Sequence, residues 1–208
     1  MRIILFTTIL FTFMVADAQI NAGDPKDNEF HLFDAGFSVG ANFSQVDGDY
    51  YAGFNKLGIT AGPIIHLNFN PNWSASLELL YSQKGAKSKP DPNNVNTYLF
   101  VLDYAEVPVL INYNDKNRLL IQAGLAYGRN IKAFEEVNGI DTNGGEVIKS
   151  DELSYVLGGT FLIGEMKHWG ANFRYEGSIT KVGPSPNPKV VGLVNRLIAV
   201  RGIYYFLV

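Results

Sequence analysis

The chain has 208 residues, a formal net charge of -3 at pH 7, a pI near 5.6 and no cysteine. A weakly acidic chain of this kind does not favour nucleic-acid binding, and the lack of cysteine excludes stabilisation by disulfides. The 21 glycines and 13% aromatic residues favour an all-β chain with many turns. Beyond the N-terminus, no segment has the run of about 18 or more apolar residues that indicates a transmembrane helix.

The first 18 residues have the features of a secretory signal peptide. Arg2 supplies the positive charge, residues 3–15 are an apolar run, and Ala16-Asp17-Ala18 fits the small-x-small cleavage pattern. The alternative, an uncleaved anchor, would need about 20 apolar residues to cross the membrane as a helix. We therefore predict cleavage of residues 1–18, a polar N-terminal lead over 19–32 and one folded domain over 33–208.

Eight later segments alternate between apolar residues and small or polar residues, with the two-residue period of β-strands. The predicted strands cover residues 33–44, 57–69, 73–85, 99–113, 118–131, 151–163, 168–180 and 195–208. Most exceed the ~5–6 residues of a typical globular strand and reach the ~9–11 residues of a strand tilted across a bilayer. The connections alternate between long and short, as in outer-membrane barrels. The sequence therefore predicts an all-β, eight-stranded, antiparallel, up-and-down transmembrane β-barrel.

The hairpin Leu57–Gly85 predicts how the barrel is oriented across the membrane. Its tight turn, Asn70-Pro71-Asn72, is expected on the periplasmic side, with both ends of the hairpin at the external rim. Aromatic residues near strand ends are expected to form the interfacial girdles. They are Phe69, Trp73, Tyr81, Tyr113, Tyr127, Trp169, Tyr175 and Phe206. Pro63 and Pro108 fall inside strands, where proline removes a ladder hydrogen bond, so we expect a bulge or kink at each.

Three motifs resemble strands of a known family. They are Gly40-Ala41-Asn42-Phe43-Ser44-Gln45, Glu78-Leu79-Leu80-Tyr81-Ser82-Gln83-Lys84-Gly85 and Tyr104-Ala105-Glu106-Val107-Pro108-Val109-Leu110. The chain resembles the PorT-like outer-membrane β-barrel family over nearly its whole mature length. This resemblance implies a porin-like eight-stranded barrel in the outer membrane of a Gram-negative bacterium. It implies no defined activity, although the naming member of the family is linked to protein secretion across that membrane.

The polar face of the predicted strands carries the candidate lumen residues. They are His66, Glu78, Glu106, Gln122, Asn172, Arg174, Glu176 and Arg201. An eight-stranded barrel is just wide enough inside to be filled by side chains, and buried charges need partners. We expect the three glutamates and two arginines to form a near-neutral network that plugs the lumen, with each arginine as a bidentate fork. The alternative is a small gated pore lined by Glu106, Arg174 and Arg201.

The sequence offers little support for catalysis or for a bound cofactor. His31, His66 and His168 have no recognisable nucleophile motif around them, and His66 fits a packed inward residue better than a catalytic base. Asp47-Gly48-Asp49 and residues 141–146 lack the later ligands of a calcium loop. We therefore predict a protein without enzymatic activity, metal or organic cofactor. An outer-membrane enzyme that acts on lipid is the alternative, but no residue is singled out for it.

The predicted role is structural or interactive, through external loops held on a rigid scaffold in outer-membrane lipid. The candidates for contact with a protein partner are Tyr50, Tyr51, Phe54, Phe134, Glu135 and Glu136. A component associated with secretion is an alternative to this role. A soluble ligand carrier of lipocalin architecture is another, and it would require apolar residues inside its eight strands and polar residues outside.

Overall fold

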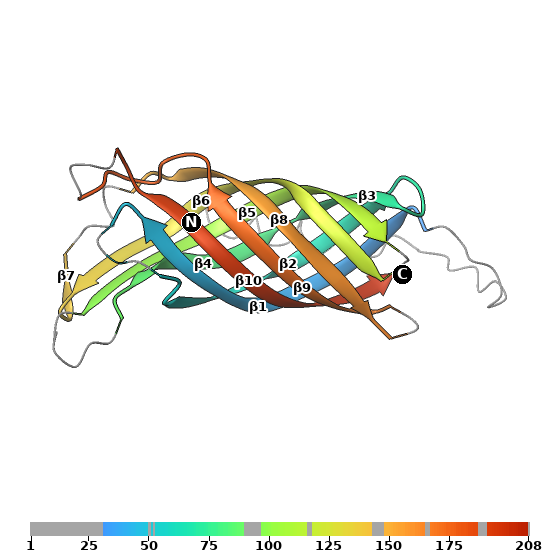
Figure 1. The fold of residues 1–208 in the computed structure, drawn as a ribbon, viewed down its shortest axis with the longest axis horizontal. Coiled ribbons are helices and arrows are strands. Elements are labelled where there is room, and N and C mark those ends of the chain that lie inside the picture. The colour runs from blue at the N-terminus through green and yellow to red at the C-terminus, as the bar shows by residue number, and fades with distance from the viewer. Residues whose placement is uncertain are drawn as a thin grey trace, which may run out of the picture.

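A computed structural model describes residues 31–49, 51, 53–89, 97–115, 118–142, 148–164, 167–186 and 191–207. They form one antiparallel sheet that closes on itself (Figure 1). Its strands are β1 (Phe33–Asp47), β2 (Lys56–Asn68), β3 (Trp73–Glu78), β4 (Leu80–Lys87), β5 (Tyr98–Asp115), β6 (Leu119–Val137), β7 (Ile140–Asp141), β8 (Asp151–Ile163), β9 (Trp169–Ser178) and β10 (Val194–Leu207). The predicted signal peptide and the lead up to residue 30 lie outside these ranges. Within them, no helix is long and apolar enough to cross a membrane.

The ring contains eight full-length strands. β3 and β4 are two halves of one strand, because both pair with β2 on one side and with β5 on the other. β7 is a two-residue strand paired with the end of β6. The pairing of β1 with β10, which runs from Ala35↔Leu207 to Asp47↔Val194, closes the ring. The predicted eight-stranded antiparallel barrel is confirmed.

The two ends of the barrel differ in the length of their connections. β7 and the long connections lie at the left of Figure 1, and the short turns and the C-terminus lie at the right. In outer-membrane barrels the short turns face the periplasm, so we name the left end external and the right end periplasmic. β5 and β6 are the longest strands, with 18 and 19 residues. At the external end β6 turns back at Asn138 and Gly139 into the short β7.

The wall has an apolar outer face and a polar inner face. Outward side chains such as Phe37, Val39, Leu77, Ile111 and Phe173 are 45–59% exposed. Inward positions are buried and many are small or polar, including Ser38, Asn42, Ser76, Gln122 and Thr160. This polarity suits a wall that faces lipid. It is the reverse of what a soluble carrier of lipocalin architecture requires.

Aromatic side chains mark both edges of the apolar wall. At the periplasmic edge, Trp73 packs edge-on against Tyr113 of β5, with ring centroids 5.1 Å apart. At the external edge, tyrosine hydroxyls have polar partners: Tyr127 donates to Asp151 at 2.6 Å, and Tyr175 accepts from Arg196 at 2.9 Å. Such rings place an apolar body against lipid and a polar tip at the headgroups.

The strand formed by β3 and β4 is interrupted at Leu79. The register passes through Pro63 and Pro108 without a shift, so neither proline forms a bulge and that part of the prediction is wrong. The flanking pairs place Pro63 beside Leu79 and Pro108 beside Glu78. Leu79 N–H donates to the Pro63 carbonyl at 3.1 Å, but proline has no N–H with which to return the second bond of such a pair. The prolines therefore break the ladder of the strand between them and leave their own strands in register.

Gly62 allows a close approach of strands at this interruption. A Cβ atom at Gly62 would collide with the carbonyl oxygen of Leu79. We expect Gly62→Ala to lower the free energy of unfolding by ~1–3 kcal/mol, the usual cost of overpacking. In the control, Gly202→Ala, the nearest atom to the new Cβ is the carbonyl oxygen of Val39 at 3.9 Å. Urea unfolding in lipid vesicles measures both variants, and equal midpoints would contradict the close approach.

Candidate functional site in the barrel lumen

Two arginines bind one carboxylate near the middle of the lumen. Glu78 of β3, Arg174 of β9 and Arg201 of β10 point inward and are fully buried. Arg174 donates from Nη1 to Glu78 Oε2 at 3.1 Å and from Nη2 to Oε1 at 2.6 Å. Arg201 Nη1 donates to Oε2 at 2.9 Å. The planar fork of Arg174 fixes the carboxylate in a bidentate geometry, and Arg201 completes an ion triad between three strands.

A layer of neutral hydrogen bonds lies on the periplasmic side of this triad. Arg201 Nε donates to Asn172 Oδ1 at 3.0 Å, and Asn172 Nδ2 donates to Gln122 Oε1 at 2.7 Å. Gln122 Nε2 donates in turn to Asn112 Oδ1 at 3.0 Å, and the Asn112 amide lies 3.4 Å from Nδ1 of His66. The contacts thus connect five strands, from β10 to β2. They place His66 as a packed polar residue of this layer.

Lys84 lies among three glutamates on the external side of the triad. Its Nζ is 2.5 Å from Glu106 Oε1, 2.5 Å from Glu176 Oε1 and 3.5 Å from Glu152 Oε2. The ammonium also lies 5.1 Å from the centre of the Tyr104 ring. We call Lys84, Glu106, Glu152 and Glu176 the Lys84 cage. Among the residues that the structure describes, no group of three His, Cys, Asp or Glu side chains is arranged to hold a metal ion.

Lys84 and Glu152 are absent from the predicted lumen set, although the period-two alternation places both of them on the inward face of their strands. Lys84 has the same parity as Glu78 on its strand, and Glu152 has the same parity as Ser154. Both lie one residue inside the end of a predicted strand, and the predicted set of inward residues did not extend to those ends. All eight predicted lumen residues lie in the triad, the neutral layer or the cage. The structure therefore connects the predicted set and adds a cation and an anion to it.

A cavity of about 220 Å³ opens at the periplasmic end. His66, Asp34 and Tyr205 line it together with apolar Leu120 and Leu162. His66 and Tyr205 pack edge to face, with ring centroids 5.5 Å apart. The lining contains no residue of the ion triad or of the Lys84 cage. The cavity is thus a mouth that ends at the neutral layer.

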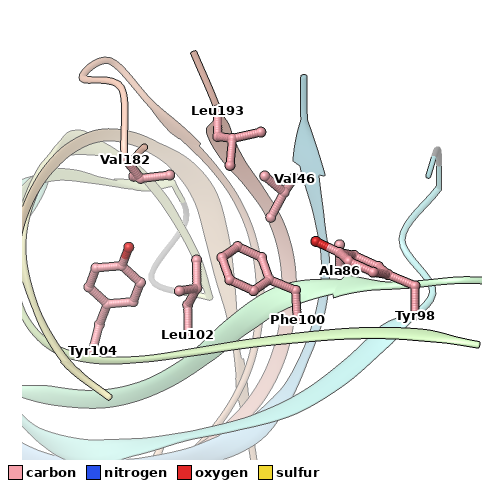
Figure 2. Close-up of a cluster of buried hydrophobic side chains, with 8 residues drawn as sticks. All are labelled: Val46, Ala86, Tyr98, Phe100, Leu102, Tyr104, Val182 and Leu193. Carbon is pink, nitrogen blue, oxygen red and sulfur yellow. The ribbon is translucent and has the colours of Figure 1, made fainter. Parts of the chain in front are cut away.

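An apolar cluster fills the interior beyond the Lys84 cage (Figure 2). It consists of Val46, Ala86, Tyr98, Phe100, Leu102, Tyr104, Val182 and Leu193. β5 supplies alternate residues from Tyr98 to Tyr104, because its inward face continues past the polar part of the lumen. Figure 2 shows Leu102 and Phe100 pointing toward Val182, Val46 and Leu193 on the opposite side. The external half of the barrel therefore has a hydrophobic core of its own.

Two of the predicted loop contacts stabilise this external end. Tyr51 stacks on Tyr98 with ring centroids 4.4 Å apart and packs against the apolar cluster. Glu135 accepts from the Tyr98 hydroxyl at 3.1 Å and from Thr142 Oγ1 at 2.7 Å. Phe54, Phe134 and Glu136 are half-buried. Tyr50 lies outside the described residues.

These elements define an integral β-barrel protein of the outer membrane: a closed antiparallel ring with a lipid-facing apolar wall and a polar lumen. Residues 17–182 match the family model described as outer membrane protein beta-barrel domain, and the chain belongs to this family. A search of curated proteins gives no match.

The comparison with solved structures gives several matches. Ail, the attachment invasion locus protein of Yersinia pestis, shares 16% identity with a TM-score of 0.51, and the alignment covers 85% of this chain and 100% of Ail. Neisserial surface protein A shares 11% identity with a TM-score of 0.49, covering 85% of this chain and 98% of that one. OprG from Pseudomonas aeruginosa shares 13% identity with a TM-score of 0.39, covering 85% and 95%. At this identity the likeness to Ail shows the fold alone.

The ion triad gives a test of the lumen geometry. Glu78→Gln removes the carboxylate and leaves two buried guanidinium groups unpaired, so we expect the free energy of unfolding to fall by ~3–5 kcal/mol. Asp151→Asn breaks the pair with Arg129 at 3.2 Å, whose side chains are 53% and 62% exposed, and should leave the stability nearly unchanged because exposed pairs contribute little. Urea titration in vesicles compares the two variants. A Glu78→Gln variant as stable as Asp151→Asn would refute the buried triad.

Asp49, in the connection between β1 and β2, gives the external end a pH dependence. Burial raises the pKa of the Asp49 carboxyl from 3.8 to about 6, against the lowering effect of the hydrogen bond from Tyr51 N–H. A raised carboxyl pKa means that the folded state binds the proton more tightly than the unfolded state does. The protonated Asp49 therefore contributes a stabilisation that is fully present below pH 4 and is lost as the pH rises through 6. We expect Asp49→Asn, whose amide oxygen can still accept from Tyr51, to remove this loss. Unfolding midpoints between pH 4 and 7 measure it, and parallel profiles of variant and wild type would contradict the assignment.

Proposed function

We propose that this protein is a sealed outer-membrane barrel that acts through its external end and does not conduct solutes. The observation that carries this proposal is the ion network, by which we mean the ion triad of Glu78 together with the Lys84 cage. Its seven charged side chains cross the lumen and are only 1–3% exposed. An eight-stranded barrel has room inside for side chains and little else. Large paired side chains at this level leave no aqueous path between the periplasmic mouth and the external end.

The apolar cluster supports the same proposal from the other side. A solute that passed the Lys84 cage would next meet the packed side chains of Phe100, Leu102 and Val182. Apolar packing of this kind excludes water and ions. The lumen therefore has two successive barriers of different chemistry, one ionic and one apolar.

The external end has the construction of an interaction platform. Its strands extend beyond the polar part of the lumen and are fixed by the Tyr51–Tyr98 stack and by Glu135. Because these side chains are used in packing, the proposed contacts with a protein partner fall to Phe54, Phe134 and Glu136, together with Tyr50. Loops on such a rigid base suit recognition better than chemistry, and the protein acts without catalysis in this proposal.

The resemblance to the PorT-like family and the signal peptide over residues 1–18 remain part of this proposal. Two of the resembling motifs contain Glu78, Lys84 and Glu106, which are members of the ion network. The resemblance therefore includes residues of the plug as well as lipid-facing residues. A role in secretion would then use the barrel as a membrane-embedded scaffold and not as the conduit.

Single-channel recording in planar bilayers tests the sealed lumen. We expect the purified barrel to give no steady conductance at any applied voltage, because no water path crosses the ion network. Protease protection in the same lipid verifies that the barrel has inserted. Steady conductance that changes in the Glu106→Gln variant would refute the plug and establish the pore alternative.

A further inference from the structure

The lumen is one positive charge short of neutrality when all its ionisable groups carry their usual charge. Four buried carboxylates face three buried cations in the triad and the cage. Lys56 and Asp103, also buried, contribute one charge of each sign and leave the balance unchanged. An excess charge in a space closed to water is costly, so such a site takes up a counter-charge or a proton.

The deficit lies in the Lys84 cage. Around Glu78, two guanidinium groups bind one carboxylate and leave one positive charge in excess. Around Lys84, three carboxylates surround one ammonium and leave two negative charges in excess. Arg174 and Glu176 are successive inward residues of β9, so the two groups are neighbours. The triad can offset one of the two excess charges, and the other remains.

The three carboxylates of the cage differ in the hydrogen bonds that they accept. Glu152 accepts from Ser154 Oγ at 3.1 Å, from Asn195 Nδ2 at 3.1 Å and from the Ser178 hydroxyl, in addition to its contact with Lys84. Donors of this kind stabilise the ionised form. Within the described part of the chain, Glu106 and Glu176 have Lys84 as their one donor, each at 2.5 Å from the same Nζ.

We propose that the Lys84 cage is a proton-binding site in which one proton is shared between the carboxyl groups of Glu106 and Glu176. Two carboxyl groups that share one small site do not both ionise readily. The charged and polar groups that face the site are Lys84 from β4, Tyr104 from β5, Glu152 from β8, Arg174 from β9 and Asn195 from β10. With the proton bound, the lumen is neutral. The inference rests on the sealed lumen of the proposed function, but its test measures protons and not conductance, so the two proposals can fail separately.

A proton held in the folded barrel couples folding to pH. An unfolded glutamate titrates near 4.3, so above about pH 5 unfolding releases the proton. The folding equilibrium constant then falls tenfold for each unit that the pH rises, until the folded cage itself loses the proton. The stability is therefore fully present at acidic pH and decreases toward alkaline pH.

The test uses the Asp49→Asn chain as its parent, so that the external carboxyl does not contribute to the slope. Urea unfolding in lipid vesicles should show the tenfold loss per pH unit from pH 5 up to the pH at which the folded cage releases its proton. Glu106→Gln and Glu176→Gln each replace a shared carboxyl with a neutral amide, so each should abolish the slope and match or exceed the parent midpoint at pH 8. A slope that persists in both variants would overturn the proposal.

Two controls separate this site from its rivals. Glu152→Gln places an amide N–H₂ among the donors of Ser154, Ser178 and Asn195, and should lower the midpoint at every pH. His66→Gln removes the other buried group able to carry the missing positive charge, and should leave the slope intact. A slope that disappears in His66→Gln, or midpoints for Glu106→Gln and Glu176→Gln as low as that of Glu152→Gln, would assign the proton elsewhere.

Infrared spectroscopy tests the site without relying on the folding of the cage variants. The folded Asp49→Asn barrel at pH 7, in a detergent without ester groups, should show the carbonyl-stretching band of a protonated carboxylic acid, and the band should disappear at high pH. Absence of the band at pH 7 would overturn the proposal.

Discussion

Closure of the ring is the constraint on which the rest of this structure depends. In the hydrocarbon core a sheet edge would leave backbone groups without partners, so the first strand must pair with the last. β1 and β10 do so along almost their whole length. Eight strands then fix the width of the interior at the dimensions of side chains. The inward side chains must therefore match the interior in volume as well as in polarity.

The chain fills that space in layers of different chemistry. From the periplasmic mouth, a layer of amides and hydroxyls is followed by the ion triad of Glu78, the Lys84 cage and the apolar cluster. Each of the two lumen arginines lies next to an inward glycine on a neighbouring strand: Gly40 is beside Arg201 and Gly158 is beside Arg174. A Cβ at either glycine would meet the arginine backbone or side chain. Glycine on the polar face thus makes room for the arginines to reach across the barrel.

The period-two alternation, together with strand length, the alternating loop lengths and the aromatic positions, was sufficient to predict the eight-stranded barrel and its polar inner face. It was not sufficient to predict partners. Glu78 and Arg174 are 96 residues apart in the chain, and only the stagger of strands around the closed ring brings them to one level. Local rules also misjudged the prolines, since the effect of a missing N–H appears on the neighbouring strand at Leu79. Tyr51 was predicted as a surface contact because no local pattern reveals the ring of Tyr98 beneath it.

The apolar cluster also bears on how the barrel reaches its final state. Val46 lies at the end of β1, Leu193 lies just before β10, and Phe100 comes from the middle of the chain. The cluster can therefore be completed only when the first and last strands meet, which is the contact of longest range in the chain. Hydrophobic burial at the external end thus arrives together with the closing hydrogen bonds of the seam.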